Sequence, residues 1–163
     1  MQNLSIPDPR GLAVGVRKSP YHILTNSEID VLIKDAEAIK ADISVFKFNE
    51  GQHTSYSDIF DEVRIRGDVL PNLDSIHPRD LMSSRAVLAH EYYGHRPYRN
   101  AEDQLPIGSW NDEFRASYMA AKNAPGLSDD DRRYLVLDAL DRAKTAGVSI
   151  KHNSFIRRVL HGY

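Results

Sequence analysis

The sequence HEYYGH at positions 90–95 combines residue types that can bind a metal ion and carry out chemistry beside it. Its two histidines, His90 and His95, carry imidazoles, which are common metal ligands. Glu91 directly follows the first histidine, and its carboxylate can take up a proton at the same place. In the common zinc-binding helix, a histidine and its adjacent glutamate are followed by a second histidine on the same face. The stretch therefore predicts a metal site with a general base beside it.

The two histidines are five residues apart, one residue more than in the common helix. At about 100° per residue, five steps of an ideal α-helix place two side chains roughly 140° apart, so they would not share an ion. A single π-type turn brings both side chains back to one face, and such turns often occur at functional sites. Gly94 is the residue that most easily tolerates a local change of the backbone. We therefore expect a π-turn or a similar distortion between His90 and His95.

Two histidines leave a catalytic zinc ion one protein ligand short, because such ions usually have three ligands and a water. Glu113 is the natural third ligand, since it lies 18 residues after His95 and near the start of a predicted helix. Two helices joined by the intervening loop can pack side by side and direct all three side chains to one point. We expect one zinc ion per chain, bound by His90, His95 and Glu113.

These residues resemble the active-site motifs of dipeptidyl peptidase III, a zincin-type zinc metallopeptidase family. HEYYGH at 90–95 matches the family pattern HExxGH, which reads HELLGH in its members. The second family motif is EECRAE or EECRAD, and DEFRAS at 112–117 follows it through the acid, Glu, Arg and Ala positions. The resemblance implies four site residues, namely the general base Glu91 and the zinc ligands His90, His95 and Glu113.

The resemblance is confined to these two short motifs, and the family's enzymes are several times longer than this chain. It therefore indicates the same active-site arrangement on a minimal scaffold. Ser117 stands where the family has an acid, so one support of the metal ligands is missing or is supplied elsewhere. Small zincin-like peptidase modules of bacterial toxins and effectors are another class in which such a compact site would fit.

Helical spacing of apolar residues predicts the elements that must position these side chains. Capping boxes are expected at Ser27 with Asp30, Ser109 with Asp112 and Ser128 with Asp131. The predicted helices cover about 28–41, 79–95, 109–123 and 128–145, with a short last helix from 153.

Strands are predicted over 12–16, 43–48 and 62–69, and loops over 49–58 and 96–108. Residues 1–25, which are rich in proline and glycine, are predicted to form an extended arm. The expected fold class is therefore α+β and helix-rich. We expect a zincin-like arrangement, in which a small antiparallel or mixed sheet from the N-terminal half packs on the active-site helix and the C-terminal half is helical.

The length of 163 residues suits a single domain over 1–163, and 41% hydrophobic with 27% charged residues is an ordinary composition. The absence of cysteine excludes a disulfide scaffold, a thiolate zinc site and a cysteine nucleophile. A formal net charge of −2 argues against a nucleic-acid partner. No apolar run approaches the roughly 18 residues that a membrane-spanning helix needs, so no membrane partner is expected.

The first residues, MQNLSIPDPRG, lack the basic start and apolar core of a signal peptide. Together with the lack of cysteine, this predicts a cytoplasmic location for the chain as written. A domain cut from a larger secreted protein would have the same features, so a delivered effector domain stays open as an alternative.

Two hypotheses for the function follow. The first is a zinc-dependent hydrolase, a metallopeptidase whose partner is a peptide or protein substrate, bound along an exposed sheet edge at 62–69. The second is a non-catalytic zinc-binding or interaction module, in which the helices serve as a binding surface. Glu91 favours the first, because a structural zinc site has no use for a carboxylate beside a ligand. The sequence gives no hint whether an inhibitor or immunity partner exists.

Three further residues are candidates for supporting the site or binding substrate. Asp112 could orient a metal-bound imidazole, or it could serve only in the helix cap. Tyr93 could act in catalysis, although a tyrosine here is more often a core or groove aromatic. His152 could stabilise a developing oxyanion, or it could be a surface histidine.

Two arginines that follow the first motif, Arg96 and Arg99, could bind a substrate carboxylate or could simply be solvated. The remaining histidines before the motif, His22, His53 and His77, lie in polar segments without a pattern, and no role is predicted for them.

Overall fold

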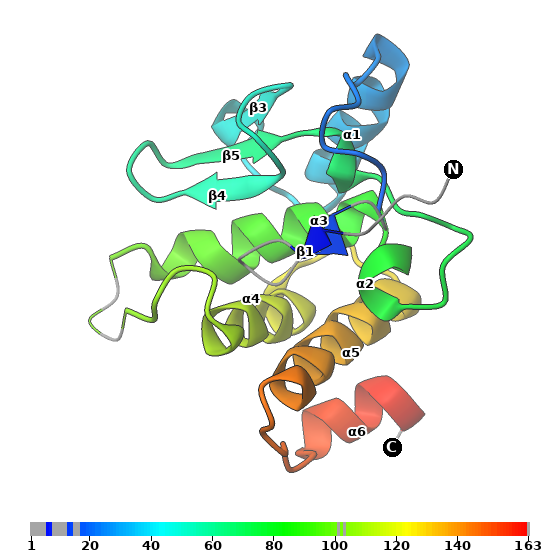
Figure 1. Ribbon diagram of the computed structural model, residues 1–163, viewed down its shortest axis with the longest axis vertical. Coiled ribbons are helices and arrows are strands. Elements are labelled where there is room, and N and C mark those ends of the chain that lie inside the picture. Colours follow the sequence, from blue (N-terminus) through cyan, green and yellow to red (C-terminus); the bar gives the residue numbers. More distant parts are fainter. Residues whose placement is uncertain (1–5, 8–12, 15–16, 101, 103, 163) are drawn as a thin grey trace.

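The computed structural model describes residues 6–7, 13–14, 17–100, 102 and 104–162. Figure 1 shows a small sheet lying across one side of a central helical segment, with longer helices on the other side. The described elements confirm the predicted helix-rich α+β class, with a mixed sheet in the N-terminal half and a helical C-terminal half. No helix among the described residues has the length and apolar character needed to cross a bilayer.

The α-helices are α1 (Asn26–Ala38), α2 (Pro78–Leu81), α3 (Ser84–Ala89), α4 (Trp110–Asn123), α5 (Asp129–Thr145) and α6 (Ser154–His161). The capping box predicted at Ser128 with Asp131 is present, and the Ser109 hydroxyl accepts a hydrogen bond from the Asp112 N–H. The box predicted at Ser27 with Asp30 is wrong, because Thr25 and Glu28 form it two residues earlier.

The helix predicted over 79–95 is divided into several elements. α2 and α3 are separated by a break at Met82 and Ser83, and Ser83 caps α3. The buried guanidinium of Arg17 donates to the Met82 carbonyl at 2.8 Å, which ties the last part of the predicted arm to this break. After α3 the chain continues as a π-helix, η3 (His90–His95), and then as a 3-10 turn, η4 (Arg96–Tyr98).

The main sheet has three strands in the order β3 (Phe46–Phe48), β5 (Glu62–Ile65) and β4 (Ser55–Ser57). β3 is parallel to β5, and β4 is antiparallel to it. The strands predicted over 43–48 and 62–69 are shorter than expected, since Ile43–Val45 and Gly67–Val69 form the 3-10 turns η1 and η2. β1 (Ile6–Pro7) pairs with β2 (Ala13–Val14), which lies within the strand predicted over 12–16.

The position of β5 corrects one prediction about substrate binding. β5 is the central strand of the main sheet, so its backbone is paired on both sides and 62–69 is not an exposed edge. The free edge next to the π-helix belongs to β4, which lies in the segment 49–58 that was predicted to be a loop. The prediction was wrong because the alternation of buried Val63 and Ile65 shows only that one face is covered, and not which strands lie alongside.

The core surrounds α3, which contacts α1, α4 and α5. Leu88 and Ala89 of α3 are fully buried, and so is Leu135 of α5. The π-helix continues α3 between β4 and α4. This central position gives the π-helix a rigid support on the side of α4 and places its other side beneath the sheet edge.

Gly94 allows the π-helix and α4 to approach each other closely. A Cβ atom added to Gly94 would lie 2.3 Å from the carbonyl oxygen of Ala116, and 2.7 Å from its Cα. Such distances are far below normal contact, so no side chain fits here. The role of this glycine is therefore a close helix contact, which brings the histidines of η3 next to Glu113 of α4.

Candidate metal centre

The predicted backbone distortion is confirmed, because all six residues from His90 to His95 form a π-helix. This geometry returns the two imidazoles to one face. His90 and His95 lie with their Nε2 atoms 3.2 Å apart. Glu113 approaches from α4, with Oε2 2.9 Å from His90 Nε2 and Oε1 3.5 Å from His95 Nε2. One donor atom from each of the three residues lies within 4.8 Å of the others, so the group could hold a metal ion.

The distances from His90 Nε2 to the two other ligands are close to those of a tetrahedral zinc site. Zinc bonds to nitrogen or oxygen are about 2.0–2.1 Å long, which places two ligand atoms of a tetrahedron about 3.3 Å apart. His90 Nε2 lies 3.2 Å from His95 Nε2 and 2.9 Å from Glu113 Oε2, while the distance of 3.5 Å from His95 Nε2 is to the other carboxylate oxygen, Glu113 Oε1. Two imidazoles and one carboxylate are also an established ligand set for catalytic zinc.

Burial and mutual charge shift the protonation of the cluster. Burial alone would raise the pKa of Glu113, but the charge of His95 and the hydrogen bonds from both histidines hold that pKa well below its ordinary value. Burial would lower the pKa of His95, but the charge of Glu113 and the hydrogen bond to Asp112 raise it well above the usual value. Without a metal, His95 therefore keeps a proton that a divalent cation would displace.

Glu91 lies beside the three potential ligands but is not one of them. Its side chain is buried, and Oε2 has no hydrogen-bond partner within the described part of the chain. Burial raises the pKa of this carboxyl group, although the neighbouring histidines oppose the change. A carboxylate with a free oxygen and a raised pKa suits a group that accepts and releases a proton.

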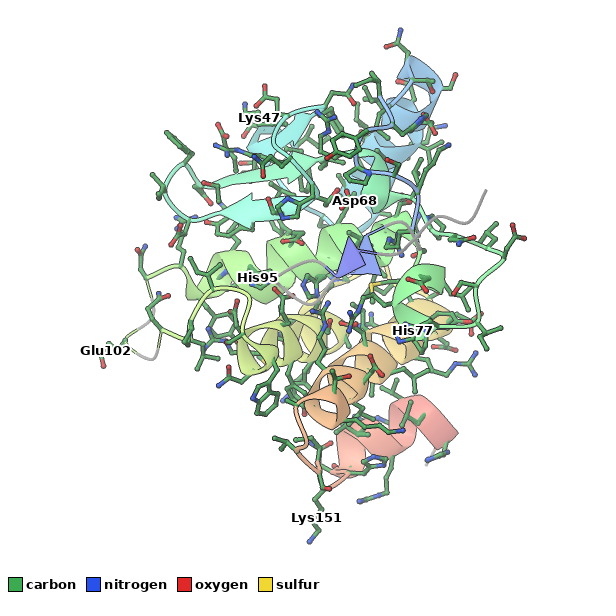
Figure 2. The ribbon with its side chains drawn as sticks, viewed as in Figure 1. Lys47, Asp68, His77, His95, Glu102 and Lys151 are labelled. Atoms are coloured by element: carbon green, nitrogen blue, oxygen red, sulfur yellow. The ribbon has the colours of Figure 1, made fainter. Side chains whose placement is uncertain are left out.

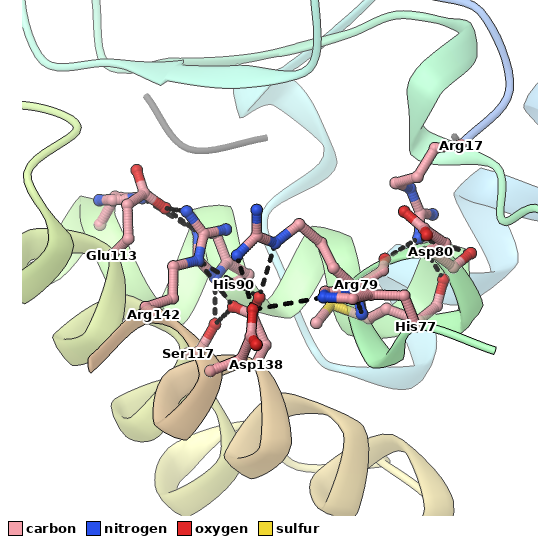
Figure 3. Close-up of polar contacts among 12 residues, drawn as sticks. Arg17, His77, Arg79, Asp80, His90, Glu113, Ser117, Asp138 and Arg142 are labelled. Atoms are coloured by element: carbon pink, nitrogen blue, oxygen red, sulfur yellow. Dashed lines mark hydrogen bonds and ion pairs between the residues drawn. The ribbon is translucent and has the colours of Figure 1, made fainter. Parts of the chain in front are cut away.

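The side chain that holds His90 is Ser117, which stands where the peptidase family has an acid. Ser117 Oγ lies 2.8 Å from His90 Nδ1 and donates its own proton to Asp138 Oδ2 at 2.6 Å. Because the hydroxyl proton goes to Asp138, Ser117 accepts the Nδ1 proton of His90. This tautomer leaves the lone pair of His90 Nε2 directed at the cluster. Asp138 thus supplies, through Ser117, the acid that position 117 lacks (Figure 3).

Asp138 belongs to a buried ionic network on α5. Its Oδ1 lies 3.1 Å from Arg79 Nε and 3.2 Å from Arg142 Nε. Burial would raise the pKa of Asp138, but the two guanidinium groups lower it, so the carboxylate stays charged. Arg142 also places Nη1 3.7 Å from Glu113 Oε2, and so reaches a second ligand. The sequence analysis did not identify Arg79, Asp138 or Arg142 as site residues. The only signal was the spacing of Asp138 and Arg142, which lie four residues apart on one helix face.

Asp112 faces the other histidine. Its Oδ1 lies 3.7 Å from His95 Nδ1, and its Oδ2 accepts a hydrogen bond from the Gly108 N–H at 3.0 Å. The backbone N–H of the same residue takes part in the Ser109 cap. Asp112 therefore lies where it can orient His95, and it also belongs to the start of α4.

Two other predicted candidates lie apart from the cluster. The hydroxyl group of Tyr93 donates to the carbonyl of Ile39 at 2.5 Å, which is a packing contact with the end of α1. His152 is exposed just before α6, on the far side of α5. In Figure 2 its neighbour Lys151 lies at the opposite end of the molecule from the sheet, while His95 lies between the sheet and α4.

The two arginines after the π-helix share one carboxylate. Arg96 contacts both oxygens of Asp61, with Nε 2.9 Å from Oδ1, and Arg99 places Nη1 2.5 Å from the same oxygen. Of the two arginines, only Arg99 lines the cavity described next. Their first role is therefore to tie the segment after η3 to the turn between β4 and β5.

An open cavity lies over the cluster. Its empty volume is about 690 Å³, including the solvent at its mouth. β4 and the residues before it, the loop before α4, and Glu91 and His95 of the π-helix line this cavity. Glu113 lines it as well, so a substrate that enters the cavity would meet two of the three potential ligands together with Glu91.

Comparison with protein-family models, with curated proteins and with solved structures finds no match to this chain. The likeness to dipeptidyl peptidase III therefore rests on the residues of the two short motifs alone.

Proposed function

We propose that this protein is a zinc-dependent hydrolase, a metallopeptidase of zincin-like arrangement, in which His90, His95 and Glu113 bind the metal and Glu91 is the general base. One observation carries the proposal. Two imidazoles of the π-helix and the carboxylate of another helix converge on one point, and Glu91, whose Oε2 has no hydrogen-bond partner among the described residues, lines the adjoining cavity. The donor set favours zinc over magnesium or calcium, which prefer ligands that are all oxygen.

Zinc bound at this point would act as a Lewis acid and would make a water molecule more acidic. Glu91 would accept a proton from the attacking water as its oxygen bonds to the carbonyl carbon of the substrate. It would then deliver that proton to the amide nitrogen as the carbon–nitrogen bond breaks. One water is consumed, and a carboxylic acid and an amine are released. Ser117, Asp138 and Asp112 would hold the two imidazoles in place.

The edge strand β4 supports a peptide as the substrate. Among the described strands β4 pairs with β5 alone, and its residues line the cavity together with Glu91 and His95. An extended peptide can add to such an edge through main-chain hydrogen bonds. This placement would bring the scissile amide over the cluster, and it replaces the edge that was first expected at 62–69.

The second candidate function is a zinc-binding or interaction module without catalysis. A structural zinc site normally has four protein ligands, whereas three side chains converge among the described residues. A purely structural role also leaves the buried, unpartnered oxygen of Glu91 without a purpose. These two observations favour the hydrolase.

Metal analysis together with a Glu91→Gln variant tests the proposal. Wild-type protein should bind about one zinc ion per chain, and His90→Ala should lose it. Glu91→Gln should keep zinc and stability, while hydrolysis of a fluorogenic peptide library should fall on the order of 100- to 10,000-fold. His152→Ala, a histidine variant far from the cluster, is the matched control and should keep both.

Failure to bind added zinc would overturn the proposal, and so would full activity of Glu91→Gln. Loss of zinc in Glu91→Gln would make Glu91 a ligand or support. Expression of wild type and Glu91→Gln in bacteria separates two versions of the proposal. Toxicity that disappears in the variant would favour a delivered effector peptidase over a housekeeping enzyme.

A further inference from the structure

A second residue of the cavity has a buried polar atom that the proposed mechanism does not use. His53 lines the cavity together with Glu91 and His95, and its Nε2 atom is buried without a hydrogen-bond partner in the described part of the chain. Buried polar atoms are nearly always paired, so an unpaired one at a cavity wall points to a partner that arrives with the ligand. Glu91 lines the same cavity, and its buried Oε2 also has no hydrogen-bond partner in the described part of the chain. Two residues of one cavity therefore each carry an unpaired polar atom, an oxygen that can accept and a nitrogen that can donate.

The backbone at His53 is held firmly in place. The next residue, Thr54, is buried, and its N–H and hydroxyl both donate to Asp68 Oδ1, at 2.9 and 2.6 Å. The Thr54 hydroxyl also accepts a hydrogen bond from the Arg66 N–H at 3.0 Å. These contacts anchor the start of the edge strand to the end of β5 and to η2. The backbone next to His53 is therefore held in place at the cavity wall that this segment and β4 provide.

His53 does not belong to the potential metal ligands. The three donor atoms that lie within 4.8 Å of one another come from His90, His95 and Glu113. Tyr56, another donor along the cavity, is already engaged, because its hydroxyl group donates to Asp61 at 2.8 Å.

We infer that His53 is a catalytic residue of the proposed hydrolase, which donates a hydrogen bond from Nε2 to the substrate carbonyl oxygen as that oxygen gains negative charge. The inference rests on the proposed function. A substrate in the cavity would lie between Glu91, which handles the proton of the attacking water, and His53, which stabilises the developing charge. Such donors act mainly in the transition state, so they raise kcat more than they lower KM.

The test uses His53→Ala and His53→Gln in the zinc-loaded protein, with His152→Ala as the matched control. Zinc content and the urea unfolding midpoint should stay at wild-type values in all three. With a fluorogenic peptide found in the library screen, His53→Ala should lower kcat on the order of 100- to 1000-fold and change KM little. His53→Gln keeps an N–H donor and should recover part of that loss.

A readout without turnover uses acetohydroxamate, a small ligand that presents oxygens to zinc and to a neighbouring donor. Its affinity for the zinc-loaded protein, measured by calorimetry, should fall about tenfold in His53→Ala and stay unchanged in His152→Ala. If wild type binds zinc but cleaves no peptide, the proposed peptidase activity fails, while the calorimetric comparison still decides whether His53 donates. Wild-type kcat with a raised KM, loss of zinc, or unchanged acetohydroxamate binding in His53→Ala would each overturn the inference.

Discussion

Replacing Asp138 by asparagine would remove one buried charge that supports the metal ligands from outside the cluster. Asp138 receives the Ser117 hydroxyl proton at 2.6 Å and lies 3.1 and 3.2 Å from Arg79 Nε and Arg142 Nε. An asparagine oxygen can still accept from Ser117, but it no longer neutralises two guanidinium groups. Their side chains are only 12% and 4% exposed, so water cannot replace the lost charge.

Two magnitudes follow from this arrangement. Removing one partner of a buried ion pair typically costs about 3–5 kcal/mol, because the remaining charge stays buried. We expect the lower end, about 3 kcal/mol in the free energy of unfolding, since the hydrogen bond to Ser117 can persist. Loss of a group that orients a metal-bound imidazole lowers metal affinity by about 10- to 100-fold. As long as the variant stays folded, lost stability alone leaves the metal affinity of the folded state unchanged.

The assay measures the two effects separately. Urea unfolding of the metal-free protein gives the stability, and competition with a chromophoric chelator gives the zinc affinity. Asp141→Asn is the matched control, because Asp141 pairs with Arg79 Nη2 at 3.3 Å and is 30% exposed. Asp141 also lies 3.4 Å from His77 Nε2, and its replacement should change stability by less than about 1 kcal/mol. Equal zinc affinities for Asp138→Asn and Asp141→Asn would refute the support that we assign to Asp138.

Two more predictions concern the π-helix and the cluster. Gly94→Ala should lower the free energy of unfolding by about 3 kcal/mol and weaken zinc binding. The added Cβ would meet the Ala116 carbonyl and push η3 away from α4. Wild-type stability of this variant in urea would contradict the close contact. Zinc affinity should rise with pH up to the raised pKa of His95 and level off above it, because the metal displaces the proton that Glu113 stabilises there. Calorimetry in buffers of different ionisation enthalpy should show proton release on binding below that pKa, and a pH-independent affinity would be evidence against the cluster as the zinc site.

The sequence alone was sufficient to predict the π-helix and the three residues that converge on it. His90 and His95 are five positions apart, so their side chains can share a face only if the helix is locally widened, and this constraint is covalent and local. Glu113 was predictable because a capped helix start places its first turn at a defined point after a loop. Helix α5 was predicted for the same reason, from Ser128 and Asp131 at its start.

Tertiary structure decided which groups surround that cluster. α5 is rich in charged residues, and composition alone does not tell which of its faces is buried. Only its packing against α4 reveals that Asp138 and Arg142 lie inside the protein. The sequence pattern of such a helix resembles a solvated surface, because burial of charge depends on partners far away in the chain.

The edge strand β4 and the position of His53 could not be predicted from the sequence, for a related reason. β4 has only three residues, too few for an alternating pattern, and it forms a strand because β5 pairs with it. His53 lines one cavity with Glu91 and His95 only because this pairing brings the segment before β4 next to the π-helix. Spacing within one helix is local geometry that a sequence carries, whereas the walls of the cavity come from segments that meet only in the folded chain.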